Sequence, residues 1–293
     1  MARFSSPAKQ AASVIKSLQG GVIKSVSTAS NYEKCLTQVA KYIQEKKLGS
    51  LREMTPESAR HYLEHRGQQV GLKTLDMERQ ALQRMMIHVT KQLSDTQKLP
   101  RIKSELDEAL DSRAYPIHQV EMILKSQQPH NALASEISFA AGLRAHELLT
   151  LQPAEKKPAH LRPKLETKWQ GLIGDRFTVT GKGGLTREVV IPRRLTGRLE
   201  MLKLDLPILK IDRGIYYMQH YALAGGKNWS SSFSSASKRV LGWSTGAHGL
   251  RHSYAQNRMD TLQKLGLARD LALETVSQEM GHFRPEITEV YLR

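Results

Sequence analysis

The amino-acid sequence predicts a mainly α-helical protein with a small antiparallel β-sheet, built from an all-α module followed by an α+β domain. Apolar residues recur at helical spacing through the first hundred residues, which is typical of amphipathic helices. A polar, proline-containing stretch then interrupts this pattern, as linkers do. Further along, two β-branched runs separated by glycines predict a β-hairpin. The sequence therefore predicts a domain at 1–98, a linker at 99–114 and a second domain at 115–293.

The first module is predicted to hold four helices with basic outer faces. Pro7 follows a serine and Pro56 follows a threonine, and each pair is typical of an N-cap with proline in the first turn. The stretches 32–43 and 73–93 carry apolar residues three and four positions apart. Together these features predict a compact helical module of the first hundred residues.

The second domain is predicted to begin with helices at 117–126 and 131–141. The hairpin follows at 176–191, with a glycine-rich turn around Lys182. From Leu195 onward the sequence predicts mostly helix, interrupted by a serine-rich loop at 229–237. The segment before the hairpin, 152–175, is rich in proline and lysine, and we interpret it as an inserted basic loop.

The chain of 293 residues carries a net charge of +16, which suits nucleic acid, an anionic membrane surface or acidic partners. Residues 1–100 contain 16 basic and 8 acidic side chains, and residues 151–240 contain 17 and 7. A membrane-binding helix would concentrate the excess on one face of a single segment. The spread over two long regions instead favours a long polyanion that the protein contacts at many points.

Cysteine content and hydropathy exclude several other classes. A single cysteine, Cys35, excludes an intrachain disulfide and any cysteine-based zinc site, and it fits a reducing compartment. No apolar run approaches the roughly 18 residues of a membrane span, and the first residues lack the apolar core of a secretory signal. We therefore expect a cytoplasmic protein without membrane contact.

Four short segments of the second domain contain side chains suited to chemistry at a phosphodiester: Arg144 with Glu147, Lys182, His248 with Arg251, and His282 with Tyr291. Arginine forks bind non-bridging oxygens in pairs, histidine donates to them, and lysine can act as an acid. No acidic pair or cysteine accompanies these segments, so the sequence predicts neither a metal nor another cofactor.

In this order the four segments resemble the tyrosine recombinase (phage integrase) family. That family has Arg-x-x-Glu-Leu, a lysine on a β-hairpin turn, His-x-Leu-Arg-His, and Gly-His with a tyrosine nine positions after the histidine. Here Arg251 follows His248 by three positions, and Tyr291 follows His282 by nine. The helical module resembles the family's SAM-like core-binding domain and the second domain its catalytic domain. The resemblance covers nearly the whole chain. The two-domain organisation is similar to that of Xer-like site-specific recombinases.

The resemblance implies that Tyr291 is the nucleophile. It would attack the scissile phosphate, displace a 5′-hydroxyl and leave a 3′-phosphotyrosyl link. Arg144 and Arg251 would clamp the phosphate and stabilise its developing charge. Glu147, one helical turn after Arg144, would orient rather than react.

The resemblance also assigns the proton transfers. His282 would donate to a non-bridging oxygen, His248 would assist proton transfer at the tyrosine, and Lys182 would protonate the leaving oxygen. By contrast, His252 and His146 are expected to be structural or exposed rather than catalytic. Six further side chains are candidate DNA contacts, the first three on a helix that resembles the family's DNA-contacting helix: Lys73, Thr74, Arg79, Arg187, Lys238 and Arg239.

The implied function is a site-specific DNA recombinase or integrase of a bacterial mobile genetic element, which acts at the nucleoid. It would bind double-stranded recombination sites, assemble on them as a homotetramer and act with DNA-bending accessory proteins. A type IB topoisomerase-like enzyme and a catalytically silent DNA-binding protein remain alternatives. Two departures stand out. The 31 residues from Arg251 to His282 predict a longer helix or a loop around 261–274. The chain also stops two residues after Tyr291, which predicts weak tetramers and a loosely held Tyr291 without DNA.

Overall fold

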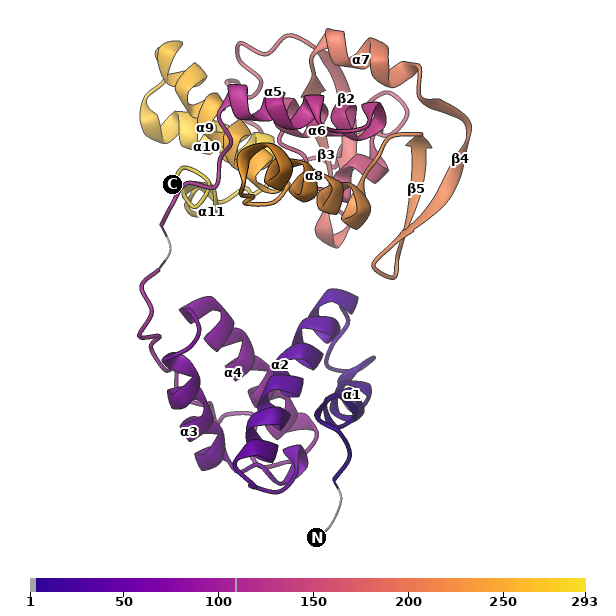
Figure 1. Ribbon diagram of the computed structural model, residues 1–293. Helices are drawn as coiled ribbons and strands as arrows, with labels where there is room; N and C mark the ends of the chain where they lie inside the picture. The colour runs from indigo at the N-terminus through magenta and orange to yellow at the C-terminus, as the bar shows by residue number, and fades with distance from the viewer. Residues whose placement is uncertain (1–3, 109) are drawn as a thin grey trace. The chain divides into compact units, whose positions relative to one another are not determined.

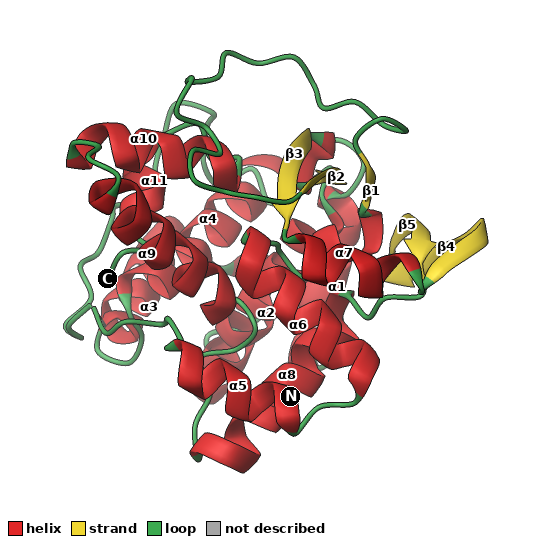
Figure 2. Cartoon of the chain, turned by 90° about the horizontal axis from the view of Figure 1, so that it is seen from above, coloured by secondary structure: helices red, strands yellow, loops and turns green. Residues whose placement is uncertain are grey.

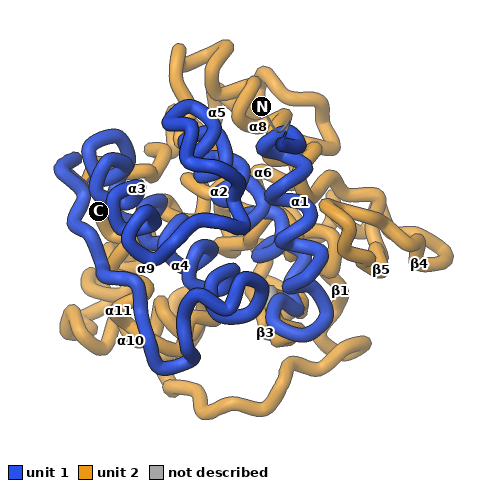
Figure 3. Tube along the Cα trace, turned by 90° about the horizontal axis from the view of Figure 1, so that it is seen from below, with its two compact units in different colours: residues 1–109 blue, residues 110–293 orange. Residues whose placement is uncertain are grey.

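Helices make up most of the chain, and the β-structure is confined to its second part. The computed structural model describes residues 4–108 and 110–293. The chain divides into two compact units, Met1–Ala109 and Leu110–Arg293 (Figure 3). The boundary falls within the stretch 99–114.

Unit 1 consists of helices that pack around one apolar core (Figure 1). They are α1 (Pro7–Leu18), α2 (Val26–Glu45), a 3₁₀ turn at Leu51–Glu53, α3 (Pro56–Gly67) and α4 (Leu72–His88). The start of α3 follows from its sequence, because Thr55 accepts a hydrogen bond from the Ser58 amide at 3.2 Å and so caps the first turn. The core gathers the apolar positions that recur at helical spacing, among them Leu36, Leu63, Leu82 and Met85.

The predicted linker is anchored at both of its ends. Leu99 is buried in the core of unit 1, and the Glu105 amide donates to the Gly67 carbonyl at 2.9 Å. On the other side, the Tyr115 amide donates to Ser253 Oγ at 2.8 Å within unit 2. The stretch between units is therefore shorter than the interruption in the sequence pattern.

Unit 2 combines helices with two antiparallel sheets. Its helices are α5 (Ile117–Lys125), α6 (Pro129–Ala141), α7 (Arg193–Glu200), α8 (Gly226–Leu241), α9 (Gly249–Lys264), α10 (Arg269–Met280) and α11 (Pro285–Glu289), with 3₁₀ turns η2 (Glu147–Thr150) and η3 (Lys182–Gly184). The first sheet has the order β1 (Gln152–Pro153), β2 (Asp175–Thr180) and β3 (Thr186–Ile191). The register pairs Phe177 with Val189. The predicted hairpin is thus present with its bounds within one residue.

Two apolar clusters hold unit 2 together. The larger one joins α5, α6 and α8 to the first sheet, with Ile137, Val179 and Phe233 fully buried. The smaller one lies between α9 and α10, and Tyr291 and Leu292 pack against it. The four segments predicted to carry the chemistry therefore lie on, or next to, elements that also contribute side chains to these cores.

Two predictions for the region after Leu195 are wrong. Residues 203–221 form a second hairpin, β4 (Lys203–Asp212) and β5 (Ile215–Tyr221), which extends from the edge of unit 2 (Figure 1). The supposed serine-rich loop is the helix α8, because Trp229, Phe233 and Ala236 share one face and bury it in the core. The long Arg251–His282 interval is filled by almost all of α9, a short turn and α10.

Candidate active site

Arg251 lies in the first turn of α9 and is fully buried. Its guanidinium donates to the carbonyl oxygens of Gly142 and Met280, the latter at 2.6 Å. Gly142 ends α6 with a φ of 61°, and a Cβ there would lie 2.5 Å from the ring of Tyr254, so this position requires glycine. The buried guanidinium of Arg251 thus joins the ends of α6 and α10.

Glu147 is the carboxylate that organises the neighbouring arginines. It is fully buried in η2 and accepts from Arg144 Nη1 at 2.7 Å, from the Arg144 amide at 2.8 Å and from Arg187 Nη2 at 2.9 Å. Burial alone would raise the pKa of Glu147, but the charges of Arg187, Arg251 and Arg144 hold it well below the usual range. The carboxylate is therefore ionised. The Arg144 side chain stays 27% exposed and can reach a ligand.

Arg187, a candidate DNA contact, is buried and hydrogen-bonded within the protein. Its side chain is 4% exposed and spans the unit, with Nη1 donating to the Glu279 carbonyl at 2.7 Å and Nη2 to Glu147. A Cβ at Gly281 would lie 2.6 Å from Arg187 Cδ, and Gly281 also has a φ of 72°. The candidate DNA contact Arg187 is instead an internal cation that joins β3 to the end of α10.

Tyr291 lies among three histidines. Its Oη is 3.1 Å from His248 Nε2, and its ring centroid is 4.6 Å from that of His252 and 5.0 Å from that of His282. The Arg251 guanidinium carbon lies 5.6 Å from the same centroid. The tyrosine therefore contacts four side chains, all of them in α9, at its N-cap or directly after α10.

The hydrogen bonds of His282 indicate its tautomer. Arg251 Nη2 lies 2.9 Å from His282 Nε2, and an arginine can only donate, so Nε2 accepts. The proton must then be on Nδ1, which lies 2.9 Å from Thr288 Oγ1. Thr288 in α11 therefore fixes the orientation of a neutral His282.

All three histidines have lowered pKa values. His248 keeps an exposed edge, but partial desolvation of its ring, followed by the charge of Arg251, lowers its pKa to about 4. Burial and the same charge lower the pKa of His282 to about 3. Burial and the charge of Arg113 lower the pKa of His252 to about 4. At neutral pH the site therefore presents uncharged imidazoles beside buried arginines.

Lys182 occupies the tip of the first hairpin, but its side chain lies outside the described part of the structure. The turn is closed by the Gly181 amide, which donates to the Leu185 carbonyl at 2.7 Å. Gly183 and Gly184 have φ values of 81° and 82°, which favour glycine. A Cβ at Gly181 would lie 3.3 Å from Glu147 Oε1, so the backbone of this tip lies next to the arginine cluster.

The structure brings together five of the predicted catalytic residues, namely Arg144, His248, Arg251, His282 and Tyr291. Sequence reasoning missed two groups that hold Tyr291. His252, one turn after His248, was expected to be only structural, although its spacing puts both rings on one helix face. Gln256, a further turn on, donates to the Tyr291 carbonyl at 3.1 Å.

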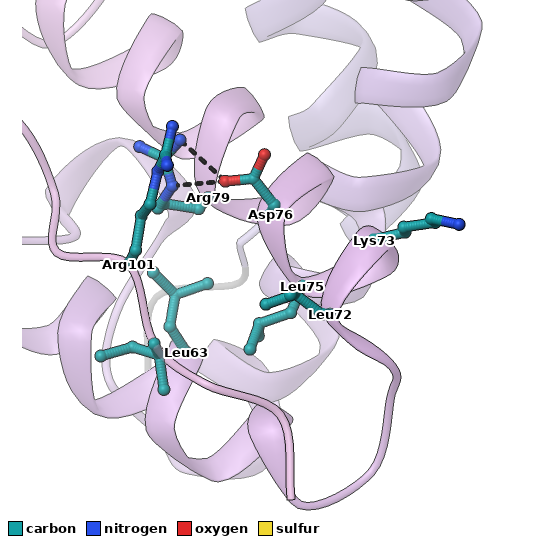
Figure 4. A pocket seen from close by; sticks show the side chains of 8 residues that line it. Leu63, Leu72, Lys73, Leu75, Asp76, Arg79 and Arg101 are labelled. Atoms are coloured by element: carbon teal, nitrogen blue, oxygen red, sulfur yellow. Dashed lines mark hydrogen bonds and ion pairs between the residues drawn. The ribbon is translucent and has the colours of Figure 1, made fainter. Parts of the chain in front are cut away.

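The candidate DNA contacts of unit 1 differ in how free they are. Lys73 is 82% exposed and has Glu108 at 3.7 Å, and Thr74 is exposed in the first turn of α4. Arg79 is 12% exposed and forms an ion pair with Asp76 at 2.8 Å. Asp76 and Arg79 line a pocket of about 280 Å³ together with Lys73. In Figure 4 the Lys73 amine points away from the Asp76–Arg79 ion pair. Arg79 is therefore engaged within the protein.

In unit 2, Lys238 and Arg239 are exposed at the end of α8, and Arg239 Nη2 donates to the Ser126 carbonyl at 2.9 Å. Within the described residues, no group of three His, Cys, Asp or Glu side chains is arranged to hold a metal ion. None of the described helices combines the length and apolar character needed to cross a lipid bilayer.

Comparisons with known proteins identify the fold. No family model matches the sequence, and no curated protein matches it. Among solved structures, the chain is similar to the XerH site-specific recombinase bound to difH substrate, with a TM-score of 0.58 and 18% identity. This similarity covers 99% of the chain and 82% of that structure. The chain has the tyrosine recombinase fold.

Two further recombinase structures agree. The Tn1549 transposon integrase in complex with transposon right end DNA has a TM-score of 0.60 at 14% identity, over 99% of this chain and 95% of that one. A lambda integrase dimer bound to a COC′ core site has a TM-score of 0.60 at 15% identity, over 97% and 76%. The recombinase fold therefore extends over both units, and the predicted fold class is confirmed.

Proposed function

We propose that this protein is a site-specific DNA recombinase that cleaves and rejoins strands through a 3′-phosphotyrosyl intermediate, for integration or excision of a mobile genetic element. The carrying observation is the hydrogen bond between Tyr291 Oη and His248 Nε2, at 3.1 Å. It lies on a recombinase fold and beside two arginines, Arg144 and Arg251. The XerH, Tn1549 and lambda proteins of that fold are named as recombinase or integrases and were observed on DNA.

In the proposed first step, Tyr291 Oη attacks the scissile phosphorus. The bond from phosphorus to the 5′-oxygen breaks, and a phosphotyrosyl bond forms. Neutral His248 is placed to accept the phenolic proton, because its Nε2 already lies at hydrogen-bond distance. Lys182 would protonate the departing 5′-oxygen. The 5′-hydroxyl of the exchanged strand then attacks the phosphotyrosyl phosphorus, and the oxygen of Tyr291 leaves and regains its proton. One phosphodiester bond is thus replaced by another, so no external energy source is needed.

The arginines would stabilise the charge that develops on the non-bridging oxygens. The guanidinium of Arg144 is held by buried Glu147 and keeps an exposed edge. Arg251 Nη2 now donates to His282 Nε2. When a phosphate accepts that hydrogen bond instead, Nε2 would be free to take up a proton, and His282 would then donate to the phosphate. A bound phosphate would also oppose the cations that lower the pKa of His282.

We further propose that the protein assembles on DNA as a homotetramer at paired sites, with DNA-bending accessory proteins. The lambda integrase structure is a dimer on its core site, which supports assembly on DNA. The two domains would be 1–98 and 115–293, joined by 99–114. In unit 1, exposed Lys73 and Thr74 remain the proposed DNA contacts, and in unit 2 Lys238 and Arg239.

The test is formation of a covalent protein–DNA adduct. The full-length protein is incubated with a pool of nicked duplexes of random sequence, and adducts that survive SDS are recovered and sequenced. Wild type and Tyr216→Phe, which alters a tyrosine that is 66% exposed, should form the adduct, whereas Tyr291→Phe should not. An adduct with Tyr291→Phe, or none with wild type, would contradict the proposal. Relaxation of supercoiled plasmid without joining of paired sites would favour a topoisomerase.

A further inference from the structure

The connection between β1 and β2 is long and lies outside the machinery described above. Antiparallel neighbours are usually joined by about 2–5 residues. Here residues 154–174 make the connection, and Figure 2 shows them arching away from the rest of the unit. We call residues 154–169 the strap.

One side of the strap is anchored to the hairpin that carries Lys182. The His160 amide donates to the Thr186 carbonyl at 3.0 Å, and Lys157 Nζ donates to Thr180 Oγ1 at 3.0 Å. Thr178 Oγ1 in turn donates to the Lys157 carbonyl at 2.8 Å. The first half of the strap therefore follows β2 and β3 toward the hairpin tip.

The other side is anchored to α10, the helix that leads into His282. The Leu165 amide donates to Gln278 Oε1 at 2.9 Å, and the hydroxyls of Thr167 and Thr275 lie 2.7 Å apart. The Trp169 amide donates to Glu279 Oε1 at 3.2 Å. The strap thus joins two elements that each contribute a segment to the candidate active site.

Between these anchors the strap presents cations to solvent. Lys156, Arg162 and Lys164 are exposed, against the two acids Glu155 and Glu166. No ion pair of the described chain engages Arg162 or Lys164. Leu161 is 101% exposed, so its side chain has no internal role. An excess of cations on an anchored loop is suited to a polyanion.

Arg162 shows that this row reaches the active site. Its guanidinium carbon lies 4.9 Å from the ring centroid of Phe283, the residue directly after His282. Phe283 has a φ of 54°, which is uncommon for an aromatic residue and marks a sharp turn. The exposed cations of the strap therefore begin next to the turn that holds His282.

We propose that the strap, through Arg162 and Lys164, contacts the phosphate backbone of the DNA duplex next to the scissile phosphate. This inference rests on the proposed function, because duplex DNA is the polyanion that the adjacent site would hold. The contact supplies affinity and position without reading sequence, since phosphates carry no sequence information directly. Leu161 is exposed between His160 and Arg162, so a probe attached at this position would lie within reach of the same duplex.

The first test measures the salt dependence of DNA binding. A fluorescein-labelled duplex of random sequence is titrated by anisotropy at several salt concentrations with wild type, with Arg162→Ala/Lys164→Ala, and with the control Lys210→Ala/Lys264→Ala. Each phosphate contact contributes about 0.9 to the slope of log affinity against log salt. The strap variant should lose nearly 2 from this slope, and the control less than 1. Equal slopes in all three proteins would overturn the proposal.

The second test uses a crosslink from the strap. Cys35 is buried, and burial raises the pKa of its thiol to about 11, so a new exposed cysteine is labelled selectively. A photocrosslinker is attached to Leu161→Cys or to the control Ile173→Cys, which is 80% exposed before β2. Crosslinks to duplex from the first and not from the second support the proposal. No crosslink from Leu161→Cys, or equal yields from both, would overturn it.

The two proposals can fail separately. If wild type forms no covalent adduct, the recombinase proposal fails, while the salt slope and the crosslink still report DNA contact by the strap. If the adduct forms but the strap variant binds like wild type, only the strap proposal fails. If Arg162→Ala/Lys164→Ala weakened binding to single-stranded RNA more than binding to duplex DNA in the same titration, the strap proposal would also be overturned.

Discussion

The ring of His252 lies 4.6 Å, centroid to centroid, from that of Tyr291, nearer than the ring of either predicted catalytic histidine. His252 is buried in α9, and its lowered pKa keeps the imidazole neutral at pH 7. It therefore packs against the tyrosine as an aromatic surface rather than as a cation.

His252→Ala is expected to slow adduct formation about tenfold, because an aromatic pair contributes roughly 0.5–1.5 kcal/mol beyond its buried area. His252→Phe keeps a ring at this position and should restore most of the rate. Single-turnover adduct assays at saturating protein measure both. A loss of DNA affinity in His252→Ala, or no rescue by phenylalanine, would show that the ring does not position Tyr291.

Stability should fall as the pH drops below about 6. The pKa values of His248, His252 and His282 are lowered to between about 3 and 4, whereas an unfolded histidine titrates near 6.5. Between these values the unfolded chain binds protons that the folded protein does not, which favours unfolding. The urea midpoint should therefore decline from pH 7 toward pH 4. His282→Asn should flatten this decline.

Glu147→Gln should destabilise unit 2 strongly. The substitution keeps the shape but leaves Arg144 and Arg187 without their buried counter-charge, which costs about 3–5 kcal/mol in comparable buried pairs. The matched control is Glu64→Gln, whose partner Arg60 is exposed and whose pair should contribute at most about 1 kcal/mol. Urea unfolding followed by near-ultraviolet circular dichroism reports both. Equal effects of the two substitutions would contradict the central role of Glu147.

Arg187→Lys should reduce adduct formation at least tenfold while DNA binding is retained. Lysine keeps the charge but cannot donate to Glu147 and to the Glu279 carbonyl at once, so the turn at Gly281 is no longer tied to the arginine cluster. Arg176→Lys, at an exposed position of β2, is the control. If Arg187→Lys weakens DNA binding instead, the side chain contacts phosphate as the sequence first suggested.

Local signals explain why much of the fold could be predicted. The helix starts at Pro7 and Pro56 depend on residues within one turn, and the first hairpin depends on glycines at its own tip. Helix α8 could not be predicted in this way. Its serines favour loops, and only burial of Trp229 and Phe233 in a distant core offsets that preference.

The second hairpin was missed although its turn signal was present. Arg213 and Gly214 have positive φ values of 51° and 75°, as two-residue hairpin turns require. Proline is disfavoured in the middle of a sheet, but β4 and β5 form a separate two-stranded sheet, in which each strand has an unpaired edge that tolerates Pro207. Apolar side chains also remain exposed on it, so alternation did not mark a buried face.

Contacts between residues that are close in the sequence could be predicted from their spacing. Contacts that depend on burial between distant residues could not. His248 and Arg251 share a helix start, and Tyr291 follows His282 across one short helix. No spacing links Arg187 to Glu147, which lies 40 residues away, so an internal bridge and a surface cation have the same local sequence. The tertiary fold alone distinguishes the two.

Arg251 donates to carbonyl groups that lie 109 residues before it and 29 residues after it. Contacts between such distant parts of a chain form slowly, because long loops must close first. The arginine, the carboxylate cluster and the tyrosine can therefore meet only in a completely folded unit 2. A partly folded molecule thus has the charge of the chain but no assembled tyrosine site, and under the proposed function it would not cleave DNA.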